Sequence, residues 1–335
     1  MISVGVVGLG YWGPNLARNV NASDRTRLAW LCDCNPTRLQ ALATQYPAAA
    51  HSTAFGDVLA DPTVDAVVIA TPVATHYRLT AAALRAGKHV LVEKPLAACV
   101  AEAAELVALA KDARRVLLVD HVFLYSPSVR KMAELVQAGE VGEILFFDSV
   151  RINLGIFQHD VNVLWDLAPH DLSIIDHLIG REPRSVVAVG ASHAGNGSED
   201  VAYLHLDYGN NLLASVHVNW LSPVKVRHFL VGGSRRSILY NELDASERVK
   251  VYDRGIDLSK DPEGIRQVLI SYRSGDVLSP RLDSTEPLQW LVEHLADCIE
   301  KSTAPISGAE QGWRITRILE AAQASLSHGG VRVNV

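Results

Sequence analysis

The chain begins with Met1-Ile-Ser-Val-Gly-Val-Val-Gly-Leu-Gly-Tyr-Trp-Gly-Pro-Asn15, and this stretch decides its fold. The apolar run 4–7 predicts a short buried strand, and the pattern after Pro14 predicts a helix. Between them lies Gly8-Leu-Gly10-Tyr-Trp-Gly13, which reads G-x-G-x-x-G. A strand, a glycine turn and a helix in this order form the setting that a dinucleotide-binding fingerprint requires.

Each glycine of the turn has its own expected role. Gly8 allows the tight turn, Gly10 lets the backbone approach a pyrophosphate, and Gly13 lets the helix pack close to the strand. The helix N-terminus then presents free N–H groups and a positive dipole end to the phosphates. Tyr11 and Trp12 lie within the turn, so we expect both beside the cofactor; for Trp12, packing within the turn is the alternative.

The second expected strand, 28–33, ends in Asp33, twenty residues beyond Gly13. An acid at this distance hydrogen-bonds the ribose hydroxyls of the adenosine, and its charge repels a 2′-phosphate. The predicted cofactor is therefore NAD rather than NADP. An aspartate that only starts a turn is the alternative.

The bulk composition excludes several classes of protein. The 335 residues, 48% hydrophobic and 20% charged, are typical of a soluble globular chain with one or two domains. A net charge of −6 without a Lys/Arg block gives no support to nucleic-acid binding. No apolar run approaches the roughly 20 residues of a membrane span, and no signal-peptide pattern is present. The four cysteines lack zinc spacing, so we expect no metal and reduced thiols in a cytoplasmic protein.

Up to residue 122 the pattern alternates between strands and helices. Expected strands are 4–7, 28–33, 48–52, 64–70, 88–93 and 115–120, with helices of up to about fifteen residues between them. This alternation predicts a doubly wound parallel sheet, and its ligand should lie at the carboxyl ends of the strands. Those ends carry the glycine turn, Asp33, Thr71-Pro72 and Glu93-Lys94.

After residue 125 strands follow one another. They are expected at 143–153, 185–191, 201–207, 212–220, 226–231 and 237–240, with a helix around 169–179 and two final helices at 286–301 and 308–327. Residues 253–285 show weak periodicity and are expected to be mostly loop. The fold class is thus α/β. An N-terminal Rossmann domain, residues 1–122, precedes an α+β domain, residues 123–335, with a large open, mostly antiparallel sheet.

The stretch Ala86-Gly-Lys-His-Val-Leu-Val-Glu-Lys-Pro95 resembles the Gfo/Idh/MocA oxidoreductases, named for glucose–fructose oxidoreductase and inositol dehydrogenase. The resemblance covers nearly the whole chain, and its most specific part is the D-x-x-x-H of Trp165-Asp-Leu-Ala-Pro-His-Asp171. Further matching segments are Gly8-Leu-Gly10, Ala70-Thr-Pro72, His76 and Pro127. The blocks 153–155, 160–171 and 219–225 resemble a branch of nucleotide-sugar 3-dehydrogenases.

Oxidation of a secondary alcohol requires a hydride acceptor, a base, and a group that stabilises the developing alkoxide. The resemblance assigns the D-x-x-x-H to Asp166 and His170, with His170 as the general base and Asp166 holding its imidazole. Their spacing puts both on one side of a helix, provided the helix begins near Asp166 with Pro169 in its first turn. The alternative is an N-cap aspartate and a first-turn histidine without catalytic roles.

Lys94 ends a strand ahead of a proline, which favours extended backbone at that position. As a compact charge it can stabilise an alkoxide and relay protons with His170, and the resemblance implies that it is catalytic; a solvated lysine is the alternative. The expected cofactor contacts are Gly8, Gly10, Tyr11, Trp12, Gly13, Asp33, Thr71, Pro72, His76, Glu93 and Lys94.

The expected substrate contacts lie just before and within the D-x-x-x-H segment. Polar side chains around one large aromatic suit a sugar ring, and Arg151 could pair with a phosphate or carboxylate, as could Lys225 or Arg227. The candidates are Arg151, Asn153, His159, Asp160, Asn162, Trp165 and His170, with His121 and Tyr125 as further ones. Surface roles for each stay open.

The sequence therefore predicts an NAD-dependent oxidoreductase that acts on a secondary ring hydroxyl of a sugar, at C3 of a nucleotide-activated sugar, or that runs in reverse as a ketosugar reductase. An inositol or aminocyclitol dehydrogenase is one alternative, and a non-catalytic NAD-binding regulator on the same fold is another. Because a broad sheet face is poorly suited to water, we expect a homo-dimer or homo-tetramer through the C-terminal sheet, and no nucleic-acid or membrane partner.

Overall fold

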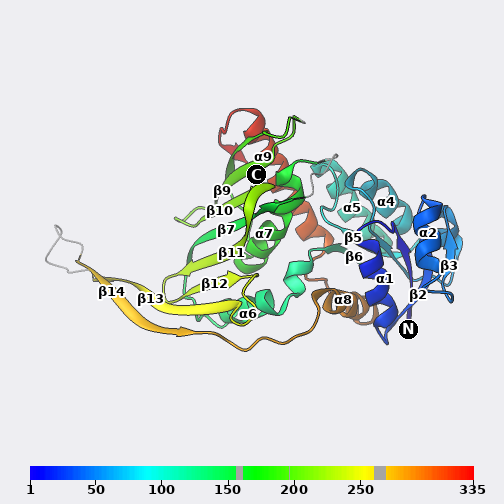
Figure 1. The fold of residues 1–335 in the computed structure, drawn as a ribbon, viewed down its shortest axis with the longest axis horizontal. Helices are drawn as coiled ribbons and strands as arrows, with labels where there is room; N and C mark the ends of the chain where they lie inside the picture. Colours follow the sequence, from blue (N-terminus) through cyan, green and yellow to red (C-terminus); the bar gives the residue numbers. More distant parts are fainter. Residues whose placement is uncertain (156–160, 196, 260–268) are drawn as a thin grey trace. The chain divides into compact units, whose positions relative to one another are not determined.

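The computed structural model describes residues 1–155, 161–195, 197–259 and 269–335, and the chain divides into two compact units (Figure 1). Unit 1 contains Met1–Ser126 and Thr285–Glu320, and unit 2 contains Pro127–Ser284 and Ala321–Val335. His159 and Asp160, two of the predicted substrate contacts, lie outside the described residues.

Unit 1 is built on a parallel sheet of six strands with the order β3-β2-β1-β4-β5-β6. The strands are β1 Ile2–Val7, β2 Thr26–Cys32, β3 Ala50–Ser52, β4 Ala66–Ile69, β5 His89–Glu93 and β6 Leu117–Asp120. Strand β1 pairs with β2 on one side and with β4 on the other, so the strand order reverses at β1. This confirms the predicted doubly wound sheet and puts its switch point beside the glycine turn.

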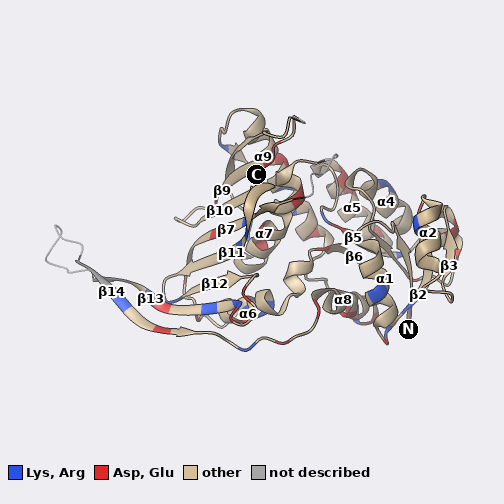
Figure 2. Ribbon diagram, viewed as in Figure 1, with Lys and Arg blue, Asp and Glu red and all other residues tan. Residues whose placement is uncertain are grey.

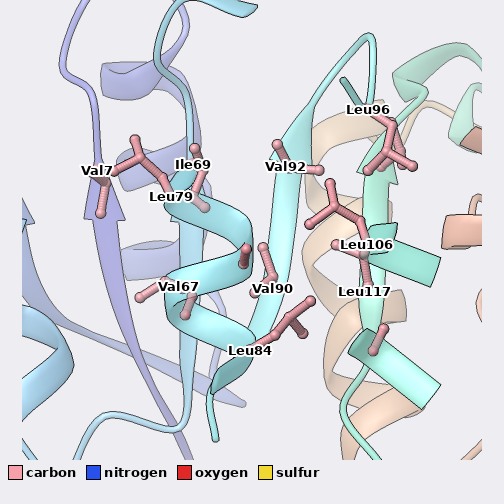
Figure 3. Close-up of a cluster of buried hydrophobic side chains, with 14 of the residues drawn as sticks. Val7, Val67, Ile69, Leu79, Leu84, Val90, Val92, Leu96, Leu106 and Leu117 are labelled. Carbon is pink, nitrogen blue, oxygen red and sulfur yellow. The ribbon is translucent and has the colours of Figure 1, made fainter. Parts of the chain in front are cut away.

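The helical elements of unit 1 are α1 Gly13–Ala22, α2 Pro36–Ala43, α3 Phe55–Ala60, η1 Val73–Thr75, α4 His76–Arg85, α5 Val100–Ala113, η2 Val122–Tyr125, α8 Pro287–Lys301 and the first turns of α9 Ala309–Ser327. Helices α1, α2, α3 and α4 contact the strands of the sheet directly, whereas α8 contacts α1 and η2. Figure 3 shows Leu79 of α4 beside Val7 and Ile69 and Leu84 of α4 beside Val90, with Leu106 in the same buried cluster. Near-continuous apolar strands are thus explained by the burial of the sheet between helices.

Helix α8 follows the second sheet in the sequence but belongs to unit 1. Several of its apolar residues, among them Leu291 and Leu295, are fully buried. Arg25, just before β2, pairs with Glu293 and Asp297 of α8 at 3.4 and 2.8 Å. The compact units therefore differ from the predicted single boundary after residue 122, because the chain returns to the first unit near its end.

Unit 2 is built on a mixed sheet of nine strands with the order β14-β13-β12-β11-β7-β10-β9-β8-β15. The strands are β7 Ile144–Leu154, β8 Ser185–Ala191, β9 Val201–Asp207, β10 Leu213–Asn219, β11 Leu221–Gly233, β12 Ser237–Asn241, β13 Val249–Ser259, β14 Leu269–Leu278 and β15 Val333–Asn334. Strands β7 and β10 are parallel, and the other pairs are antiparallel.

The prediction that residues 253–285 are mostly loop is wrong. Strands β13 and β14 form a long two-stranded ribbon that projects from the sheet of unit 2 (Figure 1). Beyond Tyr252, where β13 no longer pairs with β12, the two strands are held by backbone hydrogen bonds to each other, so they need no alternating buried face. Without such a face the sequence lacks the period-2 signal by which strands are found.

The helical elements of unit 2 cover one face of its sheet. They are α6 Pro127–Gln137, α7 Val163–Ile179 and the last turns of α9 Ala309–Ser327. Helix α7 packs on β7, β9 and β10. Along β9 the residues alternate between buried and more exposed, as the sequence predicts for a strand with one covered face.

Charged residues of both signs are spread over each unit (Figure 2). Among the described helices, none is long and apolar enough to cross a membrane. In the described ranges, no group of three or more His, Cys, Asp or Glu side chains could hold a metal ion.

We predict that Gly13→Ala destabilises the fold by roughly 1–3 kcal/mol or more, since a Cβ there would lie 2.0 Å from the Gly8 carbonyl oxygen. Gly56→Ala is the matched control. Gly56 lies in α3 with open space around its Cα, so alanine should stabilise by up to about 1 kcal/mol. Urea unfolding measures both, and equal effects would contradict the close packing of α1 on β1.

Candidate cofactor and active site

The glycine turn leaves one open position between two closed ones. Gly8 has φ +89°, and a Cβ there would lie 2.5 Å from the Ala70 carbonyl oxygen. A Cβ on Gly13 would collide with Gly8. A Cβ on Gly10 would have Arg38 Nη1 as its nearest neighbour, at 4.0 Å. Packing within the chain thus requires Gly8 and Gly13, while the bare backbone of Gly10 is available to a ligand, as a pyrophosphate requires.

Helix α1 begins at this turn without a side-chain cap on its N-terminus and without an acid in its first turn. Its N–H groups and positive dipole end therefore face the turn without competition from an acid of the helix's own first turn. Tyr11 and Trp12 are 76% and 43% exposed and meet edge to face at 5.4 Å. This cradle fits a dinucleotide phosphate.

Asp33 is buried, and both of its carboxylate oxygens accept hydrogen bonds from the chain. The Leu9 N–H donates to Oδ2 at 2.6 Å and the Asn35 N–H to Oδ1 at 2.7 Å. Asp33 thus ties the glycine turn to the end of β2. Each oxygen keeps a further lone pair, so the contact with the cofactor ribose stays a prediction.

His76 joins the loops that follow β4 and β5. Its Nδ1 lies 2.8 Å from the Pro95 carbonyl oxygen, and its Nε2 lies 2.8 Å from that of Thr71. The buried ring therefore holds together the segments that carry Thr71-Pro72 and Lys94. The His76 side chain thus has a structural role here, and its contact with the cofactor stays a prediction.

Two acids end neighbouring strands at the same edge of the sheet. Glu93 of β5 is in register with Asp120 of β6, so the two acids lie side by side on neighbouring strands. Burial raises the pKa of Asp120 well above its ordinary value, the Glu93 charge raises it further, and the Lys94 charge opposes both. Burial also raises the pKa of Glu93, against the charge of Lys94.

His121, directly after Asp120, is fully enclosed. Burial, followed by the charge of Lys94, lowers its pKa to about 3, so its ring is neutral. In the described part of the chain, neither ring nitrogen has a hydrogen-bond partner, and nor has Asp120 Oδ1. The carboxyl edge of β5 and β6 thus gathers Glu93, Lys94, Asp120 and His121, of which Asp120 was missed from the sequence.

In unit 2, Asp166 and His170 lie four residues apart on α7 and so share one side of the helix. The helix begins at Val163 rather than near 169, because the Asn162 side chain caps it by accepting from the Trp165 N–H at 3.2 Å. Pro169 therefore lies inside the helix rather than in its first turn, where it removes the N–H that would bond the Trp165 carbonyl.

Asp166 is oriented by a residue that the predicted site set did not contain. The indole Nε1–H of the buried Trp220, at the end of β10, donates to Asp166 Oδ2 at 3.2 Å. Gly155 makes room for this ring, since a Cβ there would lie 2.4 Å from Trp220 Cδ1. The sequence contained a signal for this contact, because Gly155 and Trp220 lie in the blocks 153–155 and 219–225 that resemble the sugar dehydrogenase branch.

Arg151 and Asp171 form a buried ion pair between β7 and α7. Their side chains are 4% and 3% exposed, and Nε and Nη2 of Arg151 donate to the two oxygens of Asp171 at 2.8 and 3.1 Å. Glu242 accepts from Arg151 at 3.4 Å and from Arg227 at 2.6 Å. The pair fastens the residue after His170 to the sheet. This geometry gives Arg151 a structural role; its predicted pairing with a phosphate or carboxylate of the substrate stays a prediction.

Two sequence models match the chain. Residues 2–121 match the one described as "Oxidoreductase family, NAD-binding Rossmann fold", and residues 129–239 match the "GFO/IDH/MocA C-terminal domain". The uncharacterized oxidoreductase YdgJ of Escherichia coli is 30% identical over 259 residues, which cover 73% of each chain.

This chain belongs to the Gfo/Idh/MocA family of oxidoreductases.

Two relatives of known activity belong to different substrate classes. UDP-N-acetylglucosamine 3-dehydrogenase of Acidithiobacillus ferrooxidans is 28% identical over 83% of this chain and 86% of its own. Its solved structure covers 98% of both chains with a TM-score of 0.84 at 24% identity. Inositol 2-dehydrogenase 2 of Saccharopolyspora erythraea is 30% identical over 65% of this chain and 66% of its own.

Membership of this family establishes part of the predicted chemistry. The chain is an oxidoreductase, and its first 121 residues include an NAD-binding Rossmann domain. The cradle at Gly10 is where the cofactor phosphates fit.

The other predicted substrate residues differ in their hydrogen-bond partners and burial. The Asn162 side chain already has structural partners, since it caps α7 and its Nδ2 donates to Glu199 and Gln323 at 2.7 and 2.8 Å. Asn153, on β7, has a buried Oδ1 that lacks a hydrogen-bond partner within the described ranges. A bound hydroxyl would supply the missing donor. Trp165 is partly buried in the first turn of α7. Its substrate contact stays a prediction.

We predict that Asp171→Leu costs about 3–5 kcal/mol, because it leaves the buried charge of Arg151 without its principal partner. The double variant Arg151→Met, Asp171→Leu should recover most of that loss. Asp283→Asn, which breaks an exposed pair with Arg130, is the control and should change stability by less than about 1 kcal/mol. Urea unfolding decides, and a cost below 1 kcal/mol for Asp171→Leu would contradict the assigned role.

Proposed function

We propose that the chain is an NAD-dependent dehydrogenase that oxidises a secondary ring hydroxyl of a nucleotide-activated sugar at C3. The same site run in reverse would reduce a ketosugar. The observation that carries the proposal is the Asp166–His170 arrangement on α7, with Asp166 held by the Trp220 indole. The similarity to UDP-N-acetylglucosamine 3-dehydrogenase over most of both chains supports the substrate class.

The proposed chemistry assigns one task to each group. The His170 imidazole accepts the hydroxyl proton, and Asp166 holds its ring in the productive orientation. The Lys94 ammonium stabilises the developing alkoxide. NAD, when bound, supplies the hydride acceptor.

Two further statements belong to the same proposal. The Asp33 charge selects NAD over NADP, since a 2′-phosphate would meet a buried carboxylate. Asn153 and Trp165 bind the sugar, because one offers an unpartnered acceptor and the other an aromatic face.

The expected result for Lys94→Met and His170→Asn is a fall in kcat of about 10²-fold or more, because each removes a group that acts in the transition state. Turnover is measured as NADH formation from a panel of nucleotide sugars and cyclitols. The controls Lys111→Met and His51→Asn change exposed residues of α5 and β3 and should keep wild-type rates.

Each alternative has its own signature in this experiment. NADH formation from a cyclitol and from no nucleotide sugar would favour the inositol dehydrogenase reading, which the second relative supports. Full turnover in both Lys94→Met and His170→Asn would refute the catalytic assignment. NAD binding without turnover of any substrate would favour a regulator.

We also propose that the open face of the nine-stranded sheet packs against a second copy of the chain. The side of the sheet opposite α7 exposes apolar residues on adjacent strands, including Tyr203 of β9 at 42% and Leu213 of β10 at 57%. Light scattering should give a dimer or tetramer at micromolar concentration, and Leu213→Lys should shift it toward monomer. A wild-type monomer would refute this assembly.

A further inference from the structure

Asp166 is held in two places, by its backbone and by its side chain. The Asp166 N–H donates to the Asn162 carbonyl oxygen at 3.1 Å, at the start of α7. Its Oδ2 accepts from the indole N–H of Trp220, the residue that follows β10, at 3.2 Å. The direction of the carboxylate therefore depends on two supports within unit 2, the start of α7 and the end of β10.

Glu199 holds the first support. Its carbonyl oxygen accepts from the Val163 N–H at 3.0 Å, and its Oε2 accepts from Asn162 Nδ2 at 2.7 Å. The oxygen of the same Asn162 side chain caps α7 by accepting from the Trp165 N–H at 3.2 Å. Backbone and side chain of Glu199 thus both bind the N-terminus of the helix that carries Asp166.

Asp200, the next residue, holds the second support. Its carbonyl oxygen accepts from the Trp220 N–H at 2.9 Å. Its side chain is 0% exposed, and Oδ2 accepts from the N–H groups of His193 and Ala194 at 2.7 and 2.8 Å. Oδ1 lies 2.8 Å from His193 Nδ1. The buried carboxylate therefore joins the two ends of the connection between β8 and β9, and it fixes the carbonyl group that binds Trp220.

Asp200 binds these donors as an anion. Burial acts to raise the pKa of Asp200, but the hydrogen bonds from His193 and Ala194 together lower it below its ordinary value. Because an ionised carboxylate only accepts, His193 Nδ1 is the donor in that contact. Hydrogen bonds to an ionised acceptor are stronger than those between neutral groups, and three of them offset the cost of burying the charge.

We propose that Glu199 and Asp200 are positioning residues that act on catalysis through Asp166, Glu199 by way of the start of α7 and Asp200 by way of Trp220. The inference rests on the proposed function, because Asp166 orients the His170 base there. Catalytic groups work when neighbouring hydrogen bonds keep them in the productive geometry, and small displacements lower the rate.

Paired variants separate the loss of a contact from the loss of a charge. Asp200→Ala removes the acceptor of all three hydrogen bonds. Asp200→Asn removes the charge but keeps an oxygen for the two N–H groups, and its amide can donate to His193 Nδ1. Glu199→Ala removes one acceptor of Asn162 Nδ2, whereas Glu199→Gln keeps it. Asp200→Ser, whose hydroxyl still accepts one hydrogen bond, takes the place of Asp200→Ala if that variant does not fold.

Asp244→Ala is the matched control. Asp244 Oδ1 accepts from the N–H groups of Ser246 and Glu247 at 3.0 and 2.9 Å, so this carboxylate also closes a turn of unit 2. That turn lies between β12 and β13, and the described contacts of Asp244 include neither α7 nor Trp220. The control should behave as wild type in each measurement below.

The first test is amide hydrogen–deuterium exchange of the NAD-free protein, read by mass spectrometry. Asp200→Ala should speed exchange about tenfold at residues 217–221, and Glu199→Ala should speed it severalfold at residues 163–167, because each loses a hydrogen bond that holds the segment. Asp200→Asn and Glu199→Gln should stay within about twofold of wild type. Wild-type exchange in both alanine variants would show that neither side chain holds its support, which would overturn the proposal.

Steady-state kinetics test the action on catalysis, with whichever compound of the nucleotide-sugar and cyclitol panel is oxidised fastest. Asp200→Ala should lower kcat about tenfold and leave the KM for NAD within about twofold, since the cofactor cradle lies in unit 1. Asp200→Asn should restore at least about half of the wild-type kcat. A rise in the KM for NAD without a fall in kcat would contradict a positioning role.

A double-variant cycle tests the route through the indole. Trp220→Phe keeps an aromatic ring and removes the N–H that donates to Asp166. In this background Asp200→Ala should lower kcat by less than about twofold, since the contact through which it acts is already lost. Effects that multiply would overturn the route through Trp220.

The outcomes also separate this inference from the proposed function. Full turnover in Glu199→Ala and Asp200→Ala, with turnover lost in His170→Asn, would overturn the positioning role and leave the dehydrogenase standing. If the wild type oxidises no compound of the panel, the proposed function fails. The exchange measurements then still decide whether Glu199 and Asp200 hold the two supports of Asp166.

Discussion

The fold of unit 1 depends on one steric constraint, the absence of any room for a side chain where β1 meets α1. Gly8 lies against the Ala70 carbonyl, and Gly13 lies against the Gly8 carbonyl. These contacts bring the uncapped N-terminus of α1 to the switch point of the sheet, where β1 separates β2 from β4. The same constraint leaves Gly10 open, so the packing that stabilises the sheet also shapes the phosphate cradle.

Buried charge is placed according to its role in each unit. In unit 1, carboxyl groups end three strands at the ligand edge, where Asp33 accepts from two backbone N–H groups and Glu93 accepts from the N–H of Lys94. In unit 2, Arg151 and Asp171 neutralise each other between β7 and α7. Every one of these charges has a partner that removes part of its desolvation cost, which is the condition for burying it.

The sequence was sufficient where a local pattern determines the structure. Apolar strands alternating with helices predicted the parallel sheet, and the G-x-G-x-x-G predicted the turn. It was insufficient where structure depends on pairing across the chain. Beyond Tyr252, strands β13 and β14 are held by each other rather than by a buried face. The register of Glu93 with Asp120 appears only in the assembled sheet. The ion pair of Arg151 was not predicted, because nothing local reveals its partner twenty residues away.

The most direct measurement is the fate of the hydrogen at C3 of a nucleotide sugar. A UDP-N-acetylhexosamine with deuterium at C3 is incubated with NAD and the enzyme, and the dinucleotide product is analysed by mass spectrometry. Direct hydride transfer predicts NADH that carries one deuterium, together with a 3-keto sugar. NADH without deuterium, or no NADH from any nucleotide sugar in a broad panel, would contradict the proposed reaction.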